Sequence, residues 1–377
     1  MTLKAVGIIT EYDPFHNGHL FQLQSAQAAT GADVTVVVMS SNWTQRGEPA
    51  IFDKWTRSQM ALENGVDLVI ELPIQSAVQP ASIFADQAVK LVDALKCSWL
   101  SFGSEHPEIN FNEFKTLEIK TDADEFKNYQ ESYPETFRKF FLDNHGVNLV
   151  SPNDTLGFWY AQAAKKLKSN LELVPIIRRE SDHNDNELMQ TISSGKSIRK
   201  AIKSGNSNFT KFMPQSSFNP DELKPMFWDD FWPYLKYEIN QSSLAELHNV
   251  YQMSDGLEYL FKKSAIKAQN FAEFIELVKS KRYTYTRLQR LCVYVLFKIT
   301  QAQIDTSQDN IRILGMTKKG QAYLRQVKKE LELPLISKVD KSVFEKEDYL
   351  ECKSGLLTGM ILHKQQDLYR FPVIINK

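Results

Sequence analysis

Two histidines three positions apart stand in a setting that suits nucleotide chemistry. His16 and His19 close the segment Pro14-Phe-His-Asn-Gly-His19, which follows an apolar run at 3–9. Imidazoles at positions i and i+3 of a helix start point the same way, and both can donate hydrogen bonds to phosphoryl oxygens. The predicted chemistry is attack on the α-phosphate of a nucleotide, with pyrophosphate leaving. We expect His16 and His19 to stabilise the pentavalent phosphorus and not to carry protons.

A helix that begins at this motif would favour a phosphate ligand. The first backbone N–H groups of a helix are free, and the helix dipole is positive at that end. Gly18 allows close approach of a ligand to the backbone. The alternative is a strand–helix turn whose histidines only cap the helix or face solvent.

The elements that position this motif follow from the apolar pattern of the first two hundred residues. Continuous apolar runs alternate with helical patterns, which indicates a buried parallel sheet covered by helices. Ligands of such sheets bind at the carboxyl ends of the strands. The expected fold class is α/β, a Rossmann-like parallel sheet with a mostly helical C-terminal domain. The runs lie at 3–9, 34–39, 66–72, 99–102 and 173–177.

After Ser204 the strand pattern is expected to stop. Residues 205–220 are typical of a linker, and 244–300 are helical in pattern. From about residue 311 helix is mixed with a possible strand at 369–375. We therefore predict a nucleotide-binding domain at 1–204 and a mostly helical, basic domain at 205–377.

Three further residues fall at the predicted ligand-binding edge. Gly103 ends the fourth apolar run, Asn153 begins a helix, and Arg178 follows the fifth run. Glycine would let a base or ribose lie on the backbone, Asn153 could bond an adenine or ribose edge, and Arg178 could hold phosphate. A turn glycine, a helix cap and a surface charge are the alternatives.

Two loops complete the predicted site. Residues 193–199, Ser-Ser-Gly-Lys-Ser-Ile-Arg, lead into a helix and could cradle β- and γ-phosphates through backbone N–H groups, although capping alone also explains them. Residues 40–49 combine amide, aromatic, arginine and glycine side chains, which is typical of a binding loop.

The charge of the chain is distributed unevenly. The net charge is −1, which excludes a uniformly basic nucleic-acid-binding protein, but 276–329 holds 12 Lys and Arg residues against 3 acids. Cations interleaved with exposed tyrosines suit a phosphate backbone and unstacked bases. A solvated helix face is the alternative. The RNA-binding candidates are Lys281, Arg282, Tyr283, Tyr285, Arg287 and Arg290.

The cysteine spacing and the apolar pattern indicate the cellular compartment of the protein. Cys97, Cys292 and Cys352 are too far apart in sequence for a metal or redox motif, so we expect buried thiols in a reducing compartment. The N-terminus lacks a signal-peptide pattern, and no run of about 18 apolar residues occurs, so we expect a cytoplasmic protein without a membrane span.

With these motifs together, the chain resembles the tRNA(Met) cytidine acetate ligase family of the nucleotidylyl transferase superfamily, whose signature is His-x-Gly-His. The resemblance spans nearly the full length, and its motifs are specific only when they are taken together. It rests on the segments Glu11-Tyr-Asp-Pro-Phe-His-Asn-Gly-His19, Gln45-Arg-Gly-Glu-Pro-Ala50, Ser151-Pro-Asn-Asp154, 282–290 and Arg312-Ile-Leu-Gly315.

This resemblance implies a two-step reaction. Acetate attacks the α-phosphate of ATP to give acetyl-adenylate and pyrophosphate, and the 4-amino group of the wobble cytidine of elongator tRNA(Met) then takes the acetyl group, releasing AMP. We expect Mg²⁺ to accompany ATP. The implied ATP-binding residues are Gly7, Ile8, Ile9, Thr10, Glu11, Tyr12, Asp13, Pro14, Phe15, His16, Asn17, Gly18, His19, Leu20, Gly103, Asn153 and Arg178.

Two residues depart from the family pattern. Asp13 stands where Asn is common, and a carboxylate near a triphosphate must bind metal, meet a basic neighbour or turn away. Lys196 stands where related loops often carry Thr. The sequence leaves the oligomeric state, the metal ligands and a general base for acetyl transfer open.

Two other functions remain as alternatives. An adenylyl- or cytidylyltransferase that makes a small cofactor or precursor would share the opening motif but would not need the basic segment. A non-catalytic RNA-binding protein with a vestigial nucleotide fold would not need both histidines.

Overall fold

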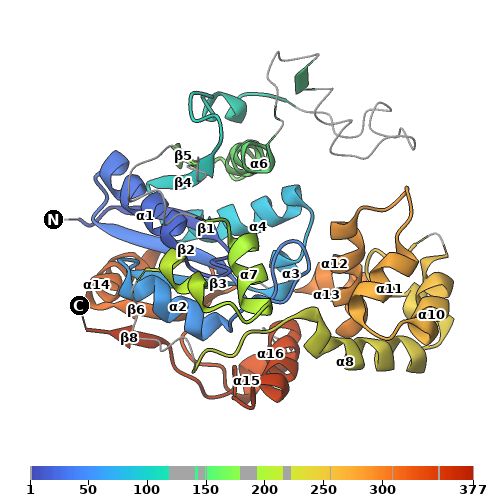
Figure 1. The fold of residues 1–377 in the computed structure, drawn as a ribbon. Coiled ribbons are helices and arrows are strands. Elements are labelled where there is room, and N and C mark those ends of the chain that lie inside the picture. Colours follow the sequence, from blue (N-terminus) through green and yellow to red (C-terminus); the bar gives the residue numbers. More distant parts are fainter. Residues whose placement is uncertain are drawn as a thin grey trace.

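A computed structural model describes residues 2–118, 141–142, 149, 151–178, 193–214, 222–254, 256–307, 309–346 and 349–376. A central sheet is covered by helices, and a helical lobe formed by α8–α13 lies to one side (Figure 1). The strands are β1 (Ala5–Thr10), β2 (Val34–Ser40), β3 (Leu68–Leu72), β4 (Trp99–Ser104), β5 (Glu172–Ile177), β6 (Ile311–Thr317), β7 (Leu335–Ile336) and β8 (Val373–Ile375).

The helices follow the predicted alternation with the strands. Those of the sheet unit are α1 (Asn17–Thr30), α2 (Lys54–Glu63), α3 (Ile74–Ala77), α4 (Ala81–Ala94), α6 (Pro152–Lys166), α7 (Gly195–Lys203), α14 (Lys318–Val327), α15 (Lys341–Lys346) and α16 (Tyr349–Leu362). Those of the lobe are α8 (Trp228–Gln241), α9 (Leu244–His248), α10 (Leu257–Lys267), α11 (Phe271–Val278), α12 (Tyr285–Leu296) and α13 (Gln301–Thr306).

The predicted Rossmann-like sheet is confirmed. The strand order is β5-β4-β1-β2-β3-β6-β7, and β1 to β5 are parallel, which is the 3-2-1-4-5 order of Rossmann sheets. All seven residues of β2 are buried, because helices cover both faces of the sheet. The chain leaves β1 for β2 on one side and returns as β4 on the other, so the strand order reverses between β1 and β4.

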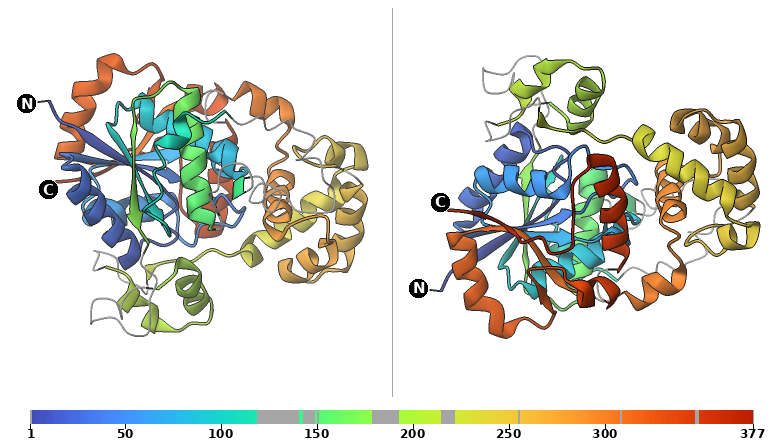
Figure 2. Two further views of the ribbon diagram at one scale, coloured as in Figure 1. Left: turned by 90° about the horizontal axis from the view of Figure 1, so that it is seen from above. Right: turned by 90° about the horizontal axis from the view of Figure 1, so that it is seen from below.

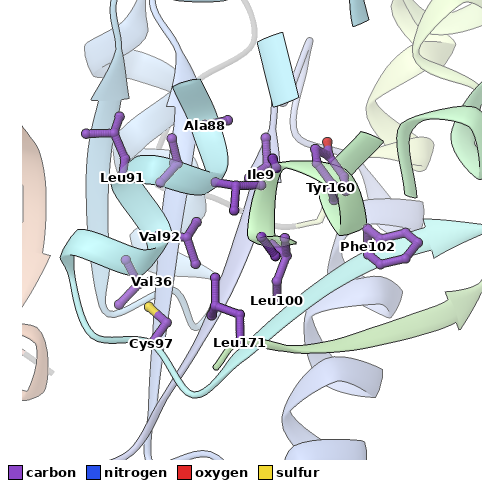
Figure 3. Packing of buried hydrophobic residues seen from close by; sticks show 14 of the residues in the cluster. Ile9, Val36, Ala88, Leu91, Val92, Cys97, Leu100, Phe102, Tyr160 and Leu171 are labelled. Atoms are coloured by element: carbon purple, nitrogen blue, oxygen red, sulfur yellow. The ribbon is translucent and has the colours of Figure 1, made fainter. Parts of the chain in front are cut away.

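The sheet core explains the apolar runs. Ile9, Val36 and Leu100 extend from neighbouring strands toward Val92 of α4, as Figure 3 shows. Cys97 is buried in this cluster, and Cys292 and Cys352 are buried elsewhere, so the expectation of buried thiols is confirmed.

The expected strand at 369–375 is confirmed in part by β8, but the expectation that the strand pattern otherwise stops after Ser204 was wrong. Strand β6 pairs antiparallel with β3, and β7 and β8 pair parallel with β6. The C-terminal residues from 309 onward therefore belong to the sheet unit, although the predicted boundary placed them with the helical domain. The sequence signal is weak because Arg312 interrupts the apolar run of β6.

Arg312 lies in a buried ionic cluster that holds the C-terminal segment on the sheet. Lys54 Nζ lies 2.5 Å from Glu71, 3.0 Å from Glu351 and 2.7 Å from Asp367. Arg312 lies 2.9 Å from Glu71 and 2.7 Å from Asp367. All five side chains are almost fully buried, and they come from α2, β3, β6, α16 and the loop after α16.

The helical lobe contacts the sheet unit through the loops that follow β2 and β3. Trp228 of α8 donates a hydrogen bond to the Gly47 carbonyl, and Tyr294 of α12 donates to the Val78 carbonyl. The views from above and below both place the lobe beside the sheet and away from α14 (Figure 2). Of the predicted linker, 215–220 lies outside the described residues. Among the helices that the structure describes, none is long and apolar enough to cross a membrane.

Candidate nucleotide-binding site

The predicted site residues meet at the carboxyl edge of the sheet where the strand order reverses. His16 follows β1, Gly103 lies near the end of β4 and Arg178 follows β5 directly. Charge from Arg178 reaches both His16 and His19, and charge from Arg199 of α7 reaches His16. This is the position at which doubly wound sheets bind their ligands.

The two histidines form a capping pair. His16 is the N-cap of α1, its Nδ1 accepts the Gly18 N–H at 3.1 Å, and His19 Nδ1 accepts the His16 N–H at 3.4 Å. The two rings stack with centroids 3.8 Å apart. Because both Nδ1 atoms accept hydrogen bonds, each neutral ring carries its proton on Nε2, where it can donate.

Both rings are held neutral. Burial lowers the pKa of His16 to about 4, with help from the charges of Arg178 and Arg199. Burial, followed by His16 and Arg178, lowers the pKa of His19 well below its usual range, although a hydrogen bond with the Pro14 backbone opposes this. Neutral imidazoles suit hydrogen-bond donation to a phosphate and not proton transfer near pH 7.

Asp13 turns away from the ligand edge. Its Oδ1 accepts the Ile51 N–H at 2.6 Å, and its Oδ2 lies 3.2 Å from Arg199 Nη1. Burial raises the pKa of Asp13, and Arg199 opposes this effect. Asp13 stands where the family commonly has Asn. In this structure its carboxylate points inward and has a basic neighbour, Arg199.

The start of α7 faces the histidine pair. Ser194 caps the helix by accepting the Ser197 N–H, and a Cβ on Gly195 would lie 3.0 Å from the Asp13 carbonyl oxygen and 3.8 Å from His16 Nε2. The first N–H groups of α7 therefore lie beside the donor atom of His16. Lys196 is exposed on the first turn. The loop predicted to cradle phosphates stands next to the histidines.

Asn153 and Arg178 are linked by Glu105, which was not identified from the sequence. A Cβ on Gly103 would meet no described atom within 4 Å, so its surroundings are open. Glu105 accepts the Asn153 Nδ2–H at 2.5 Å and the Ser151 hydroxyl at 2.6 Å, and lies 3.6 Å from Arg178 Nη1. Its place two residues after Gly103 is the only signal that could have identified it.

A second set of contacts locks the same corner. Asp154 is buried and accepts the Ser104 hydroxyl at 2.6 Å, while its Oδ2 lies 2.6 Å from His106 Nδ1. Burial opposes ionisation of Asp154, but hydrogen bonds from His106, Ser104 and Ser151 lower its pKa overall. The segments 104–106 and 151–154 therefore interlock side chain by side chain.

The other residues of the opening motif lie behind the histidines. Gly7 packs against α4, where a Cβ would lie 2.5 Å from Val92, and Ile8 and Ile9 are buried in β1. Tyr12 and Phe15 are also buried, with ring centroids 4.9 and 6.0 Å from that of His19. These residues position the pair from its apolar side.

The remaining predicted contacts of this segment are polar or lie at its borders. Thr10 Oγ1 accepts the Tyr12 N–H, and Glu11 accepts the Gln45 N–H at 2.8 Å. Asn17 donates to the Lys211 carbonyl, while Pro14 is buried and Leu20 is half-buried.

The loop at 40–49 connects the site with the helical lobe. Glu48 lies 3.5 Å from Arg199 and accepts from Gln289 of α12 at 3.3 Å. Gly47 packs on the α12 backbone, where a Cβ would lie 2.5 Å from the Arg290 nitrogen. Trp43 is fully buried, so its aromatic ring is a core contact and not a ligand platform.

The RNA-binding candidates differ in exposure. Lys281, Arg282 and Tyr285 are exposed, whereas Tyr283 is only 5% exposed, so the expectation of two exposed tyrosines was wrong. Tyr283 instead packs under Arg282 and Arg287, whose guanidinium carbons lie 5.7 and 4.7 Å from its ring centroid.

The basic segment does not form one surface. Arg312 is buried in the ionic cluster, and Lys318 and Lys319 begin α14, which Figure 1 shows on the opposite side of the molecule from α12. Arg287 donates to Ser254 Oγ at 3.2 Å, and burial lowers the pKa of Arg290. Of the basic segment at 276–329, only residues 281–290, which lie on α12 and directly before it, can form a single basic patch.

Among the described residues, no group of three or more His, Cys, Asp or Glu side chains is arranged to hold a metal ion. The carboxylate of Asp13 is already bonded to Ile51 and Arg199, so it does not face the ligand edge.

Comparison with known proteins agrees with this geometry. A family model described as HIGH Nucleotidyl Transferase matches residues 3–367. The tRNA(Met) cytidine acetate ligase of Levilactobacillus brevis is 40% identical over 377 residues, which cover 99% of this chain and 98% of that protein. The ligase of the same name from Lactiplantibacillus plantarum is 42% identical over 376 residues, with 98% of each chain covered.

Comparison with solved structures also gives matches over the full length of the chain. The crystal structure of apo Thermotoga maritima TmcAL is similar with a TM-score of 0.88 and 28% identity, and the structure of that protein bound with alpha-thio ATP has a TM-score of 0.87 at 28% identity. Each comparison covers 100% of both chains. The chain therefore belongs to the HIGH nucleotidyl transferases and, within them, to the tRNA(Met) cytidine acetate ligase family.

Proposed function

We propose that this chain activates acetate with ATP and transfers the acetyl group to the 4-amino group of the wobble cytidine of elongator tRNA(Met). One observation carries the proposal. Two stacked, neutral imidazoles stand where the strand order reverses, beside Arg178, Arg199 and the start of α7. The full-length likeness to ligases of this name supports the choice of substrates.

In the first step, an acetate oxygen attacks the α-phosphorus of ATP, the bond between the α-phosphorus and the bridging oxygen breaks, and pyrophosphate leaves. Negative charge grows on the equatorial oxygens of the α-phosphate. The Nε2–H group of His16 donates to these oxygens, the Nε2–H group of His19 exchanges the Pro14 carbonyl for one of them, and Arg178 adds positive charge. Arg199 and the N–H groups at the start of α7 stabilise the β- and γ-phosphates as they depart.

We assign the ATP site to residues 7–20 together with Gly103, Asn153 and Arg178. The open space at Gly103 would take the base or ribose, with Asn153 at its edge. Mg²⁺ would be held chiefly by the phosphates, because Asp13 is bonded to Ile51 and Arg199 and the described residues hold no group of three or more His, Cys, Asp or Glu side chains arranged for a metal ion. The ion would neutralise phosphate charge.

In the second step, the cytidine amine attacks the acetyl carbonyl carbon, the bond from that carbon to the AMP oxygen breaks, and the amine releases one proton to the solvent. Alignment of the two reactants supplies much of the rate. We assign tRNA binding to the patch formed by Lys281, Arg282, Tyr285, Arg287 and Arg290, with Tyr283 supporting the two arginines from below. A tRNA substrate also implies a cytoplasmic protein.

The test is direct acetylation. The purified chain is incubated with ATP, radiolabelled acetate and elongator tRNA(Met), and the nucleosides of the tRNA are analysed. We expect N4-acetylcytidine at the wobble position, none in a tRNA whose wobble cytidine is replaced by uridine, and one AMP per acetyl group. Nucleotidyl transfer to a small acceptor without tRNA acetylation would instead support the cofactor-synthesis alternative.

A further inference from the structure

The corner formed by the end of β4 and the start of α6 fixes the orientation of one amide. Glu105 receives the Asn153 side chain at 2.5 Å on Oε1 and the Ser151 hydroxyl at 2.6 Å on Oε2. Ser151 is itself held as the N-cap of α6, where it accepts the Asp154 N–H. Both oxygens of Glu105 are therefore engaged by groups of rigid elements.

The chemistry of a carboxylate decides which end of the amide faces it. An ionised carboxylate only accepts hydrogen bonds, so Asn153 must present its NH₂ group to Glu105. Turning the amide over would place Oδ1 against the Glu105 oxygens and break the bond. Within the part of the chain that the structure describes, Asn153 Oδ1 has no hydrogen-bond partner, so this atom, which can only accept, is the group that a ligand can meet.

The neighbourhood of this acceptor is suited to a nucleotide base. Gly103 leaves open space at the strand end, and among the described residues both Asn153 and Glu105 are only half-buried. The 6-amino group of adenine is a donor and complements Oδ1, whereas hypoxanthine and guanine carry an acceptor oxygen at that position. An acceptor opposed to an acceptor rejects the wrong base.

We infer that Glu105 sets base selectivity by holding Asn153 with its carbonyl oxygen toward the 6-amino group of adenine. Glu105 itself acts through Asn153 and is a positioning residue. The inference rests on the proposed function, because it takes the corner beside Gly103 as the base-binding end of the ATP site.

The test compares nucleotides in acetate-dependent pyrophosphate exchange. For the wild-type chain we expect kcat/KM for ATP to exceed that for ITP by at least about tenfold, since ITP replaces the amino donor with an oxygen. Purine riboside triphosphate, which lacks any 6-substituent, should fall between the two. Equal use of ATP and ITP would overturn the inference, whereas the absence of exchange with every nucleotide would contradict the proposed function instead.

Substitution of Glu105 tests the mechanism of selection. In Glu105→Gln, the new amide can donate to Asn153 Oδ1, so Asn153 can turn its NH₂ group toward the ligand. We expect the ATP-to-ITP ratio of kcat/KM to fall at least about fivefold, because the turned amide can donate to the oxygen of ITP. An equal loss for both nucleotides, with the ratio unchanged, would show that Glu105 is only structural.

Two further variants complete the test. Glu113→Gln is a matched control that should leave the ratio unchanged, because Glu113 accepts from Asn110 Nδ2 at 2.9 Å and both side chains are exposed. Asn153→Ala removes the acceptor itself and keeps the inference testable if Glu105→Gln fails to fold. It should lower kcat/KM for ATP while sparing that for ITP, and an unchanged ratio in Asn153→Ala would also overturn the inference.

Discussion

Charged side chains gather in two regions of this molecule, and the two are built differently. In the buried cluster, Lys54 and Arg312 contact three carboxylates, and all five side chains are nearly inaccessible. At the carboxyl edge of the sheet, Arg178 and Arg199 are partly exposed and lie at 3.2 Å or more from the carboxylates that they face. The ion pairs of the first region are short and buried, whereas those of Arg178 and Arg199 in the second region are longer and partly exposed.

The difference explains the pKa directions in each region. Burial raises the pKa of Glu71 to about 7, and three carboxylates hold the pKa of Lys54 above its usual range although burial opposes this. At the sheet edge burial lowers the pKa of His16, and the charges of Arg178 and Arg199 lower it further. Short buried pairs indicate a structural role, and partly exposed cations with longer ion pairs beside neutral donors indicate an anion site.

The largest effect is expected from breaking the buried cluster. Lys54→Met would leave three carboxylates with one cation, and loss of one partner from a buried ionic group costs about 3–5 kcal/mol. Urea unfolding measures the free energy. The control is Lys166→Met, which removes an exposed pair with Asp86 and should cost less than about 1 kcal/mol. Equal costs for both variants would remove the distinction between the two regions.

Lowering the pH should destabilise the folded chain through the histidine site. The pKa of His16 is about 4 in the folded chain against an ordinary value of 6.5, so the unfolded chain binds the extra proton and stability falls as pH drops from about 6.5 to 4. His16→Asn should reduce the loss of stability between pH 7 and pH 5 by about 2 kcal/mol. Unfolding at the two pH values measures this, and an identical loss in both proteins would contradict the neutral pair.

A smaller effect is expected at Arg178. Arg178→Ala should raise the ATP dissociation constant about tenfold, because one charge-assisted contact is worth about 1.5–3 kcal/mol. Calorimetric titration measures it, and tRNA affinity without ATP should stay the same. Arg325→Ala, on the exposed face of α14, is the control with no expected change. If Arg178→Ala binds ATP like the wild type, Arg178 is only a surface charge.

The smallest effect is expected on tRNA binding, and it tests whether only the α12 part of the basic segment binds tRNA. Replacing Arg282 and Arg287 together by Ala should weaken tRNA binding and reduce the log–log salt slope by about 0.7–0.9 for each phosphate that the variant no longer neutralises. Adenylate formation should persist. The matched control replaces Lys318 and Lys319 on α14, which should leave the salt slope unchanged. Equal salt slopes for the two double variants would contradict this division of the basic segment. The segment would then be either a single RNA-binding patch or a solvated surface.

The parts that could be predicted from the sequence are those with local signals. The apolar runs of β1 to β5 and the motif from Pro14 to His19 carry their own periodicity and spacing, and the structure confirms the elements. Strand β6 could not be predicted because Arg312 is compatible with a core strand only when Glu71 and Asp367 lie beside it. Those partners are distant in sequence.

Contacts between residues distant in sequence also limit how far the site can be predicted. Asn153 and Arg178 could be placed at the sheet edge by strand order, but Glu105 became visible only when the fold brought 105 beside 151–153. Tyr283 was misjudged because alternating cations predict exposure, whereas the start of α12 turns its ring into the lobe core.

The measurement that tests the role of the histidine pair most directly is acetate-dependent ATP–pyrophosphate exchange by the wild type and His19→Ala. We expect exchange by the wild-type chain that requires acetate, and at least about a tenfold loss in His19→Ala with the fold intact by circular dichroism, because a donor to the developing phosphate charge is removed. His248→Ala, an exposed histidine of the lobe, should retain full exchange. Wild-type exchange in a folded His19→Ala protein would contradict the assignment of the histidine pair.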